Sequence, residues 1–388
     1  MSGDTIHSRL SAFQGKAFLV GIAGLGLCVV GAFSNTKQFF ISYLFGYLFW
    51  LGLALGCLGF LMVHHLTGGR WGFPVRRFYE AAIMTLPLMA VLFIPICFGL
   101  KDLYLWTDAR AVAADPVLQH RSQYMTIPAF VIRAAVFFLI WSVAALVLNK
   151  WSFQQEATIA VEPTRKLRTL SGPGIVLYPL TATFVFVDWV LSLEPDWFST
   201  MFLVLIVIGQ MLTGLAFAIL LLAWLHRSEP FAATVTETHF YHLGMLLFAF
   251  VMLWTYMAFS QLLVIYSGNL PHEIVWYTHR IAGNWKVVVW FLVLFHFFIP
   301  FFLLLSRDLK HNPRALAAIA GVVFFAHIVD VYWLIAPSFS TTGIRLHWLD
   351  FAAPIGLGGI WLAAFARRLN GHPLLVHNDP RQHFAHGQ

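Results

Sequence analysis

Ten apolar stretches, each about 20 residues long, constrain this chain more than any other feature of its sequence. A helix needs about 20 residues to cross the roughly 30 Å of hydrocarbon in a membrane. Of the 388 residues, 60% are hydrophobic and 11% are charged, whereas a soluble domain has about 25% charged residues. A transmembrane barrel would instead alternate apolar and polar residues over strands of about 10 residues. The sequence therefore predicts an all-α polytopic membrane protein with ten transmembrane helices.

The apolar stretches also define the domain organisation. We place the ten predicted helices at residues 17–33, 39–64, 80–100, 128–148, 173–193, 200–225, 240–266, 286–305, 315–336 and 350–366. Residues 1–16 form a predicted amino-terminal segment, residues 17–370 the transmembrane domain, and residues 371–388 a histidine-rich tail. The longest loops, 101–127 and 149–172, are too short to fold as separate domains.

Basic residues predict the orientation of the helices. The loops on the same side as the amino terminus carry sixteen lysines and arginines, and those on the opposite side carry seven. Because lysine and arginine are retained in cytoplasmic loops, we expect both termini to lie in the cytoplasm. The net charge of +7 thus follows from membrane topology and does not indicate a nucleic-acid partner.

Cofactor motifs are missing from the sequence. Cys28, Cys57 and Cys97 stand alone inside apolar stretches, and there is no CxxC or CxxCH motif. The chain therefore lacks ligands for an iron–sulfur cluster and an attachment site for c-type haem, and we expect it to bind no metal. One alternative remains: His296 and His327, on consecutive antiparallel predicted helices, could clamp a single haem iron.

Five ionisable residues inside predicted helices stand out: Arg133, Asp188, His296, His327 and Asp330. Each costs at least about 2.5–3.5 kcal/mol to insert at mid-membrane, so each is a functional candidate. We expect Asp188 and Asp330 in the outer half of the membrane and His296 near its midplane. His327 and Asp330 share one helix face, because residues three apart are neighbours on a helix.

A second polar set lies nearer the cytoplasmic ends and the middle of the helices; its members are His64, Glu80, Glu237, His239, His242, Gln210 and Thr213. Carboxylates and imidazoles can relay protons, because burial and neighbouring charges move their pKa values. The two sets could therefore form a discontinuous polar line across the membrane. The structural alternative is that Arg133 and Asp188 form a fixed ion pair, and that His327 and Asp330 lock one helix.

Glycines predict close contacts between helices. Gly52 and Gly56 form a GxxxG pattern on the second predicted helix, and Gly356, Gly358 and Gly359 lie on the tenth. Such patterns let helix backbones approach one another, although they do not identify the partner helix.

Five longer stretches carry a family resemblance. They are residues 43–69 (YLFGYLFWLGLALGCLGFLMVHHLTGG), 192–202 (SLEPDWFSTMF), 244–276 (GMLLFAFVMLWTYMAFSQLLVIYSGNLPHEIVW), 296–307 (HFFIPFFLLLSR) and 330–337 (DVYWLIAP). Together they resemble the ActF subunits of alternative complex III, a bacterial quinol:cytochrome c oxidoreductase. More distantly, they resemble the membrane subunits of the NrfD/polysulfide-reductase-like family.

The resemblance implies a ten-helix subunit in which helices two to nine form two four-helix bundles. It implies partners: a sister membrane subunit, ActC, with the better-defined quinol pocket, multihaem cytochrome c subunits and an iron–sulfur protein. The c-type haems and iron–sulfur clusters would lie in those partners, and menaquinol or another quinol would be the electron donor. Membrane subunits of this family are proposed to conduct protons, and Asp188, His296, His327 and Asp330 are the positions that match this role.

Three hypotheses follow. In the first, the chain holds no redox centre and provides a proton path; its residues are Asp188, His296, His327, Asp330, Arg133, Gln210, Glu80, His64 and His242. In the second, it binds quinol itself, with Asp188 or His327 as proton acceptor and Tyr256 or Trp189 beside it. In the third, it is a structural membrane anchor for the complex.

Overall fold

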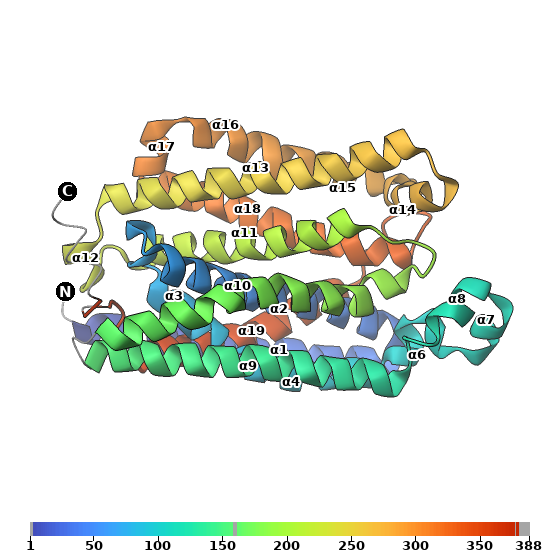
Figure 1. The fold of residues 1–388 in the computed structure, drawn as a ribbon, viewed down its shortest axis with the longest axis horizontal. Coiled ribbons are helices and arrows are strands. Elements are labelled where there is room, and N and C mark those ends of the chain that lie inside the picture. Colours follow the sequence, from blue (N-terminus) through green and yellow to red (C-terminus); the bar gives the residue numbers. More distant parts are fainter. Residues whose placement is uncertain (1–2, 158–160, 377, 380–388) are drawn as a thin grey trace.

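The chain folds into a bundle of long helices (Figure 1). The structure is a computed structural model, and it describes residues 3–157, 161–376 and 378–379. Within these residues the protein has no strand, and ten helices are long and apolar enough to cross a membrane. The prediction of an all-α chain with ten helices long and apolar enough to span a membrane is therefore confirmed. The first and last long helices start and finish at the same end of the bundle, where His7 Nδ1 lies 2.6 Å from Asn370 Oδ1. We call this the terminal end and the opposite one the distal end.

Eight of the ten spans are single continuous helices. They are α1 (Gly3–Ser34), α2 (Thr36–Thr67), α9 (Ile127–Ala157), α10 (Val161–Trp189), α11 (Thr200–Leu225), α13 (Glu237–Gly268), α18 (Pro313–Ile335) and α19 (Leu349–Asn370). Several extend beyond the predicted apolar ranges, because a helix continues for one or more polar turns past its apolar part. Residues 3–16, predicted as a separate segment, thus form the first turns of α1.

Short elements connect the spans. They are η1 (Arg70–Gly72), α6 (Leu100–Leu103), η2 (Leu105–Thr107), α7 (Ala109–Ala114), α8 (Pro116–Arg121), η3 (Leu191–Leu193), α12 (Phe231–Thr234), α14 (Pro271–Ile281), α17 (Arg307–His311) and η5 (Ala336–Ser338). Helices α7 and α8 project past the distal end, and α12 and α17 lie at the terminal end (Figure 1).

Two spans are interrupted by prolines. The third consists of α3 (Arg76–Ile83), α4 (Leu86–Leu92) and α5 (Ile94–Phe98), with Pro87 and Pro95 in the first turns of α4 and α5. The eighth consists of α15 (Trp285–Leu292), the π-helical segment η4 (Val293–Phe298) and α16 (Ile299–Leu305). A proline ring clashes with the carbonyl group four residues earlier, which for Pro300 is that of His296. The wider π turn relieves this clash, and such turns are frequent at functional sites.

Helix α2 is the centre of the bundle, because nearly every residue from Phe39 to Met62 is buried. Its GxxxG pattern faces α11: a Cβ atom at Gly56 would overlap the Gln210 carbonyl group, and one at Gly52 would lie 3.2 Å from Gln210 Cγ. On the opposite side, α1 packs against α19 through Gly24 and Gly356. Close contact at α2 therefore brings the Gln210 side chain into the core.

We expect Gly56→Ala to separate α2 from α11 and to destabilise the fold by about 1–3 kcal/mol, the usual cost of overpacking a close-packed core. The measurement is thermal unfolding of the purified chain in detergent. Gly26→Ala is the matched control, since nothing lies within 4 Å of a Cβ atom at that helical glycine. Equal unfolding midpoints for the two variants would show that the α2–α11 contact can relax without cost.

Candidate functional site

A cluster of polar side chains lies in the middle of the bundle. It consists of His296 from η4, His327 and Asp330 from α18, and Gln210 from α11, all of them buried. His327 Nδ1 lies 3.4 Å from Asp330 Oδ2, and the rings of His296 and His327 are 5.7 Å apart between centroids. We call these four residues the central cluster. The sequence placed His327 beside Asp330 on one helix face, and the structure adds His296 and Gln210 from other helices.

Local backbone features position the cluster. His296 lies within the π turn, and its ring centroid is 3.9 Å from that of Trp254 on α13. His327 packs against the backbone of α11 at Gly209, where a Cβ atom would lie 2.6 Å from His327 Cε1. Any larger residue at position 209 would therefore push the His327 ring away from Gln210.

Several polar atoms in the cluster lack hydrogen-bond partners among the described residues. These are both ring nitrogens of His296, His327 Nδ1 and Gln210 Nε2. A buried polar atom without a partner costs about 1–3 kcal/mol, and such atoms in native structures call for a ligand, an ion or water. The central cluster is thus able to bond to something other than protein.

A cavity of about 20 Å³ lies at the cluster, lined by Gln210, His327 and Asp330 together with apolar side chains from α2, α10, α11 and α18. About 10–15 Å³ is enough for one water molecule. Tyr178 extends the polar line, because its hydroxyl group donates to Gln210 Oε1 at 2.9 Å. A water molecule in the cavity would join this Tyr178–Gln210 pair to His327 and Asp330.

Larger ligands do not fit this space. Sites for drug-sized molecules have volumes of about 300–1,000 Å³, so neither a haem between His296 and His327 nor a quinol ring at His327 fits the cavity of about 20 Å³. A single metal ion is a different case, since the potential ligand atoms of His296, His327 and Asp330 lie within 4.8 Å of one another. Two imidazoles and a carboxylate suit zinc at bond lengths of about 2.0–2.2 Å, which would require these atoms to move closer. The absence of metal stays a prediction.

Arg133 and Asp188 form an ion pair nearer the distal end. Arg133 Nε lies 2.7 Å from Asp188 Oδ2, and its Nη1 donates to the Tyr124 carbonyl oxygen at 3.0 Å. The Arg133 guanidinium group also stacks on the Tyr124 ring at 3.9 Å. Burial, with the nearby Asp188 charge, raises the pKa of the Tyr124 hydroxyl to about 12. Asp188 does not line the central cavity, so the structure keeps this pair separate from the central cluster.

Glu80 belongs to a third group, at the terminal end. It accepts from Arg76 Nε at 2.8 Å, from Arg77 Nη1 at 2.6 Å and from Ser152 Oγ at 2.6 Å. Arg76 also reaches Asp379 near the end of the chain, at 2.9 Å. The Glu80 carboxylate is therefore neutralised by two arginines, a network that spacing alone did not predict.

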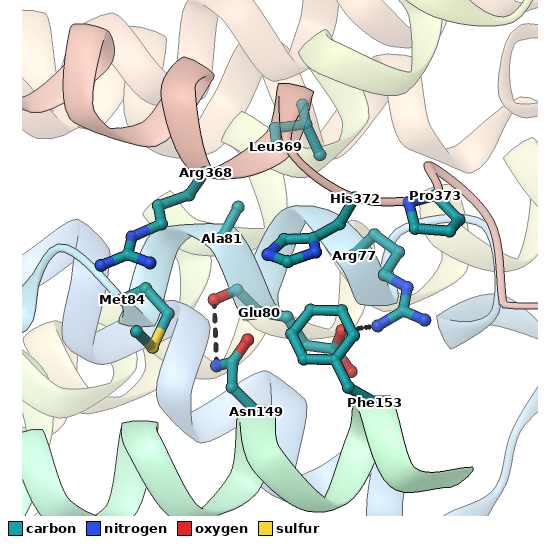
Figure 2. Close-up of a pocket in the computed structure, with 10 residues that line it drawn as sticks. All are labelled: Arg77, Glu80, Ala81, Met84, Asn149, Phe153, Arg368, Leu369, His372 and Pro373. Atoms are coloured by element: carbon teal, nitrogen blue, oxygen red, sulfur yellow. Dashed lines mark hydrogen bonds and ion pairs between the residues drawn. The ribbon is translucent and has the colours of Figure 1, made fainter. Parts of the chain in front are cut away.

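A pocket of about 50 Å³ opens beside Glu80, with His372 above it and Asn149 and Phe153 below (Figure 2). Burial and the positive charges of Arg77 and Arg368 lower the pKa of His372. The His372 imidazole is thus biased towards its neutral form. The other tail histidines of the sequence, His377, His383 and His386, lie outside the described residues.

The remaining residues of the predicted proton path lie elsewhere at the terminal end. The ring of His64 packs edge-on against Trp71 and Phe73, with centroid separations of 5.6 and 5.1 Å. His242 is half-buried on α13, beside Tyr241. Neither histidine lines the central cavity or the Glu80 pocket. The predicted polar line therefore exists as separate groups.

The two aromatic residues of the quinol hypothesis lie in different surroundings. Trp189 is 1% exposed and stacks on Phe93 with ring centroids 4.3 Å apart. Tyr256 is 62% exposed on α13. Neither lines the cavity at His327.

Sequence reasoning missed several polar residues in the core. Tyr178 does not stand out in the sequence, because a tyrosine is common within apolar stretches. Arg280 of α14 was counted as a loop residue, but it is buried, lies 2.6 Å from Glu194 Oε1 and donates to the Leu334 carbonyl oxygen at 2.7 Å. Asp350 is also buried and accepts from Ser42 Oγ at 2.5 Å. These residues are buried by helices that are distant in the sequence, and a single sequence does not show which helices pack together.

Comparison with known proteins adds no assignment. No family model matches the chain, and no curated protein matches it.

We expect Asp188→Asn to destabilise the fold by about 2 kcal/mol, because it leaves the Arg133 charge without its carboxylate partner. Removing one member of a fully buried ion pair destabilises a protein by about 3–5 kcal/mol. Arg133 is 20% exposed, which lowers the cost. The measurement is thermal unfolding in detergent. The double variant Arg133→Gln/Asp188→Asn should recover part of the loss. Equal losses in the single and double variants would mean that the ion pair does not act as a unit.

Proposed function

We propose that this chain is an integral membrane subunit of a bacterial quinol:cytochrome c oxidoreductase of the alternative complex III type, and that it provides a transmembrane proton path. The resemblance of five stretches to ActF subunits supports the assembly, and the central cluster supports the proton path. The chain itself would hold no redox centre, in keeping with the lack of haem-attachment and cluster motifs in its sequence. Quinol oxidation would take place in neighbouring subunits.

The observation that carries the proton path is the environment of Asp330. Glu80 and Asp188 each lie within 2.8 Å of an arginine nitrogen, so both carboxylates are held by fixed positive charges. Within the described part of the chain, Asp330 has no arginine or lysine within 4 Å; His327 Nδ1 lies 3.4 Å from its Oδ2, and a His296 ring nitrogen lies within 4.8 Å of the carboxylate. A carboxyl group beside an imidazole, with room for one water molecule, is able to exchange a proton, whereas a carboxylate fixed by arginine is not.

The order of groups suggests a route. Protons would enter at the terminal end, near the Glu80 pocket, and reach Gln210 through Tyr178. From Gln210 a water molecule in the cavity would lead to His327 and Asp330, and His296 would act as a second carrier beside His327. Asp188, Arg133, His64 and His242 would then tune the route or line its ends.

The assembly-level part of the proposal rests on the resemblance. Spans two to nine would form two four-helix bundles, a division supported by the packing of α9 on α10 and of α11 on α13 and α18. The chain would lie in the inner membrane with both termini in the cytoplasm. Its partners would be ActC, multihaem cytochrome c subunits and an iron–sulfur protein, with menaquinol or another quinol as electron donor.

We expect Asp330→Asn to leave assembly and quinol:cytochrome c electron transfer measurable while slowing proton transfer through this chain about 10²-fold or more, the usual contribution of a positioned acid or base. The measurement is the number of protons released or taken up per electron by the purified complex in vesicles. Asp330→Glu, which keeps a titratable group, should retain most of the proton yield.

Asp350→Asn is the control for this experiment, because Asp350 is equally buried but bonded to Ser42 and Gln38 outside the central cluster. It should leave the proton yield unchanged. A normal yield in Asp330→Asn would support the anchor hypothesis, which the ion pairs at Asp188 and Glu80 favour. Loss of the yield in both asparagine variants would indicate general damage to the fold.

A further inference from the structure

An open groove lies at the terminal end, away from the central cluster. It has a volume of about 610 Å³ and is formed by the end of α11, the first turn of α13, α17 and the first turn of α18. Its lining residues are polar apart from one proline: His226, Arg227, Glu237, Arg307, Asp308, His311, Asn312, Pro313 and Arg314. The groove therefore lies where the helices would leave the hydrocarbon.

The groove carries more positive charge than its own carboxylates neutralise. Arg227, Arg307 and Arg314 are all exposed, and no carboxylate of the described residues lies within 4 Å of any of them. Two carboxylates line the same groove. Three guanidinium groups that have no ion-pair partner among the described residues, against two carboxylates, make this a site that favours an anion.

Lys310, on the same short helix α17, adds a buried positive charge. Its side chain is 6% exposed, and its Nζ lies 3.1 Å from Met245 Sδ and 5.4 Å from the centre of the Tyr241 ring. Burial, followed by the charge of Arg307, lowers the pKa of Lys310. An ammonium group surrounded by sulfur and aromatic rings, without a carboxylate, is stabilised by an anion bound nearby.

Apolar side chains continue from the groove towards the middle of the helices. Phe302 and Leu305 of α16, which precede α17, are 61% and 55% exposed, and Met245 of α13 is 41% exposed. A ligand that matches both regions has an anionic head and hydrocarbon chains. Inorganic phosphate or an acidic protein loop would match only the first.

We propose that this groove binds the phosphate group of an anionic phospholipid, with the acyl chains along Phe302, Leu305 and Met245. Arginine bonds phosphate oxygens through two parallel N–H groups, and basic pockets between transmembrane helices bind such head groups. Lipid binding at this groove does not require proton transfer, so an experiment can disprove this proposal without affecting the proton path proposed above.

The experiment is lipid binding by the purified full chain, delipidated and returned to nanodiscs that contain phosphatidylcholine with or without cardiolipin or phosphatidylglycerol. Retained lipid is counted by native mass spectrometry. We expect selective retention of the anionic lipids, weakened about fivefold by Arg307→Gln and about fivefold by Arg314→Gln, the contribution of one basic side chain near such a head group. Arg307→Lys, which keeps the positive charge but loses the paired N–H groups, should weaken retention less than Arg307→Gln does.

Arg345→Gln is the matched control, since Arg345 is an exposed arginine that lines a different groove, beside Trp285 and Asp350. It should bind anionic lipid as the unaltered chain does. The proposal is overturned if anionic and zwitterionic lipids are retained equally, if the control loses as much lipid as Arg314→Gln, or if inorganic phosphate at equal concentration displaces the lipid. Unfolding midpoints of all variants identify any loss that comes from misfolding.

Discussion

The structure depends on one constraint: inside hydrocarbon, every polar group must find its partner within the protein. The backbone meets this constraint by forming helices, which supply ten spans in the described part of the chain. Polar side chains meet it by gathering inside the bundle, where Arg133 pairs with Asp188 and Glu80 with two arginines. The central cluster is different, because His296 and Gln210 keep buried polar atoms that have no hydrogen-bond partner among the residues that the structure describes. That exception is the physical basis for assigning function to the cluster.

Backbone features, more than charges, position the side chains of the central cluster. Pro300 disturbs the hydrogen-bond ladder at His296 and produces the π turn that holds this residue. Gly209 gives the His327 ring room against α11, and Gly56 lets α2 approach α11 at Gln210. Small residues and one proline thus position the polar side chains of the central cluster. The cavity of about 20 Å³ beside Gln210, His327 and Asp330 has room for one water molecule.

Charged side chains have different partners at the ends of the bundle and in its middle. Carboxylates fixed by arginine hold helices together near both ends of the bundle. The carboxyl group of Asp330 lies beside the imidazole of His327 and has no arginine or lysine partner among the described residues. At the terminal end, Arg227, Arg307 and Arg314 line an open groove and have no carboxylate within 4 Å among the described residues. The same residue types therefore have different surroundings at the two ends and in the middle of the bundle, and our proposals for their roles follow from those surroundings.

The sequence by itself determined the fold class, the ten spans and the neighbouring positions of His327 and Asp330, because helix length, hydropathy and the i, i+3 spacing are local properties. It also indicated that Gly52 and Gly56 would face another helix. Only the tertiary structure decided that this helix is α11, that His296 joins His327, that Asp188 is paired with Arg133, and that Tyr178 and Arg280 are buried polar residues. Contacts of this kind join helices far apart in the chain, and no periodicity in a single sequence records which faces meet.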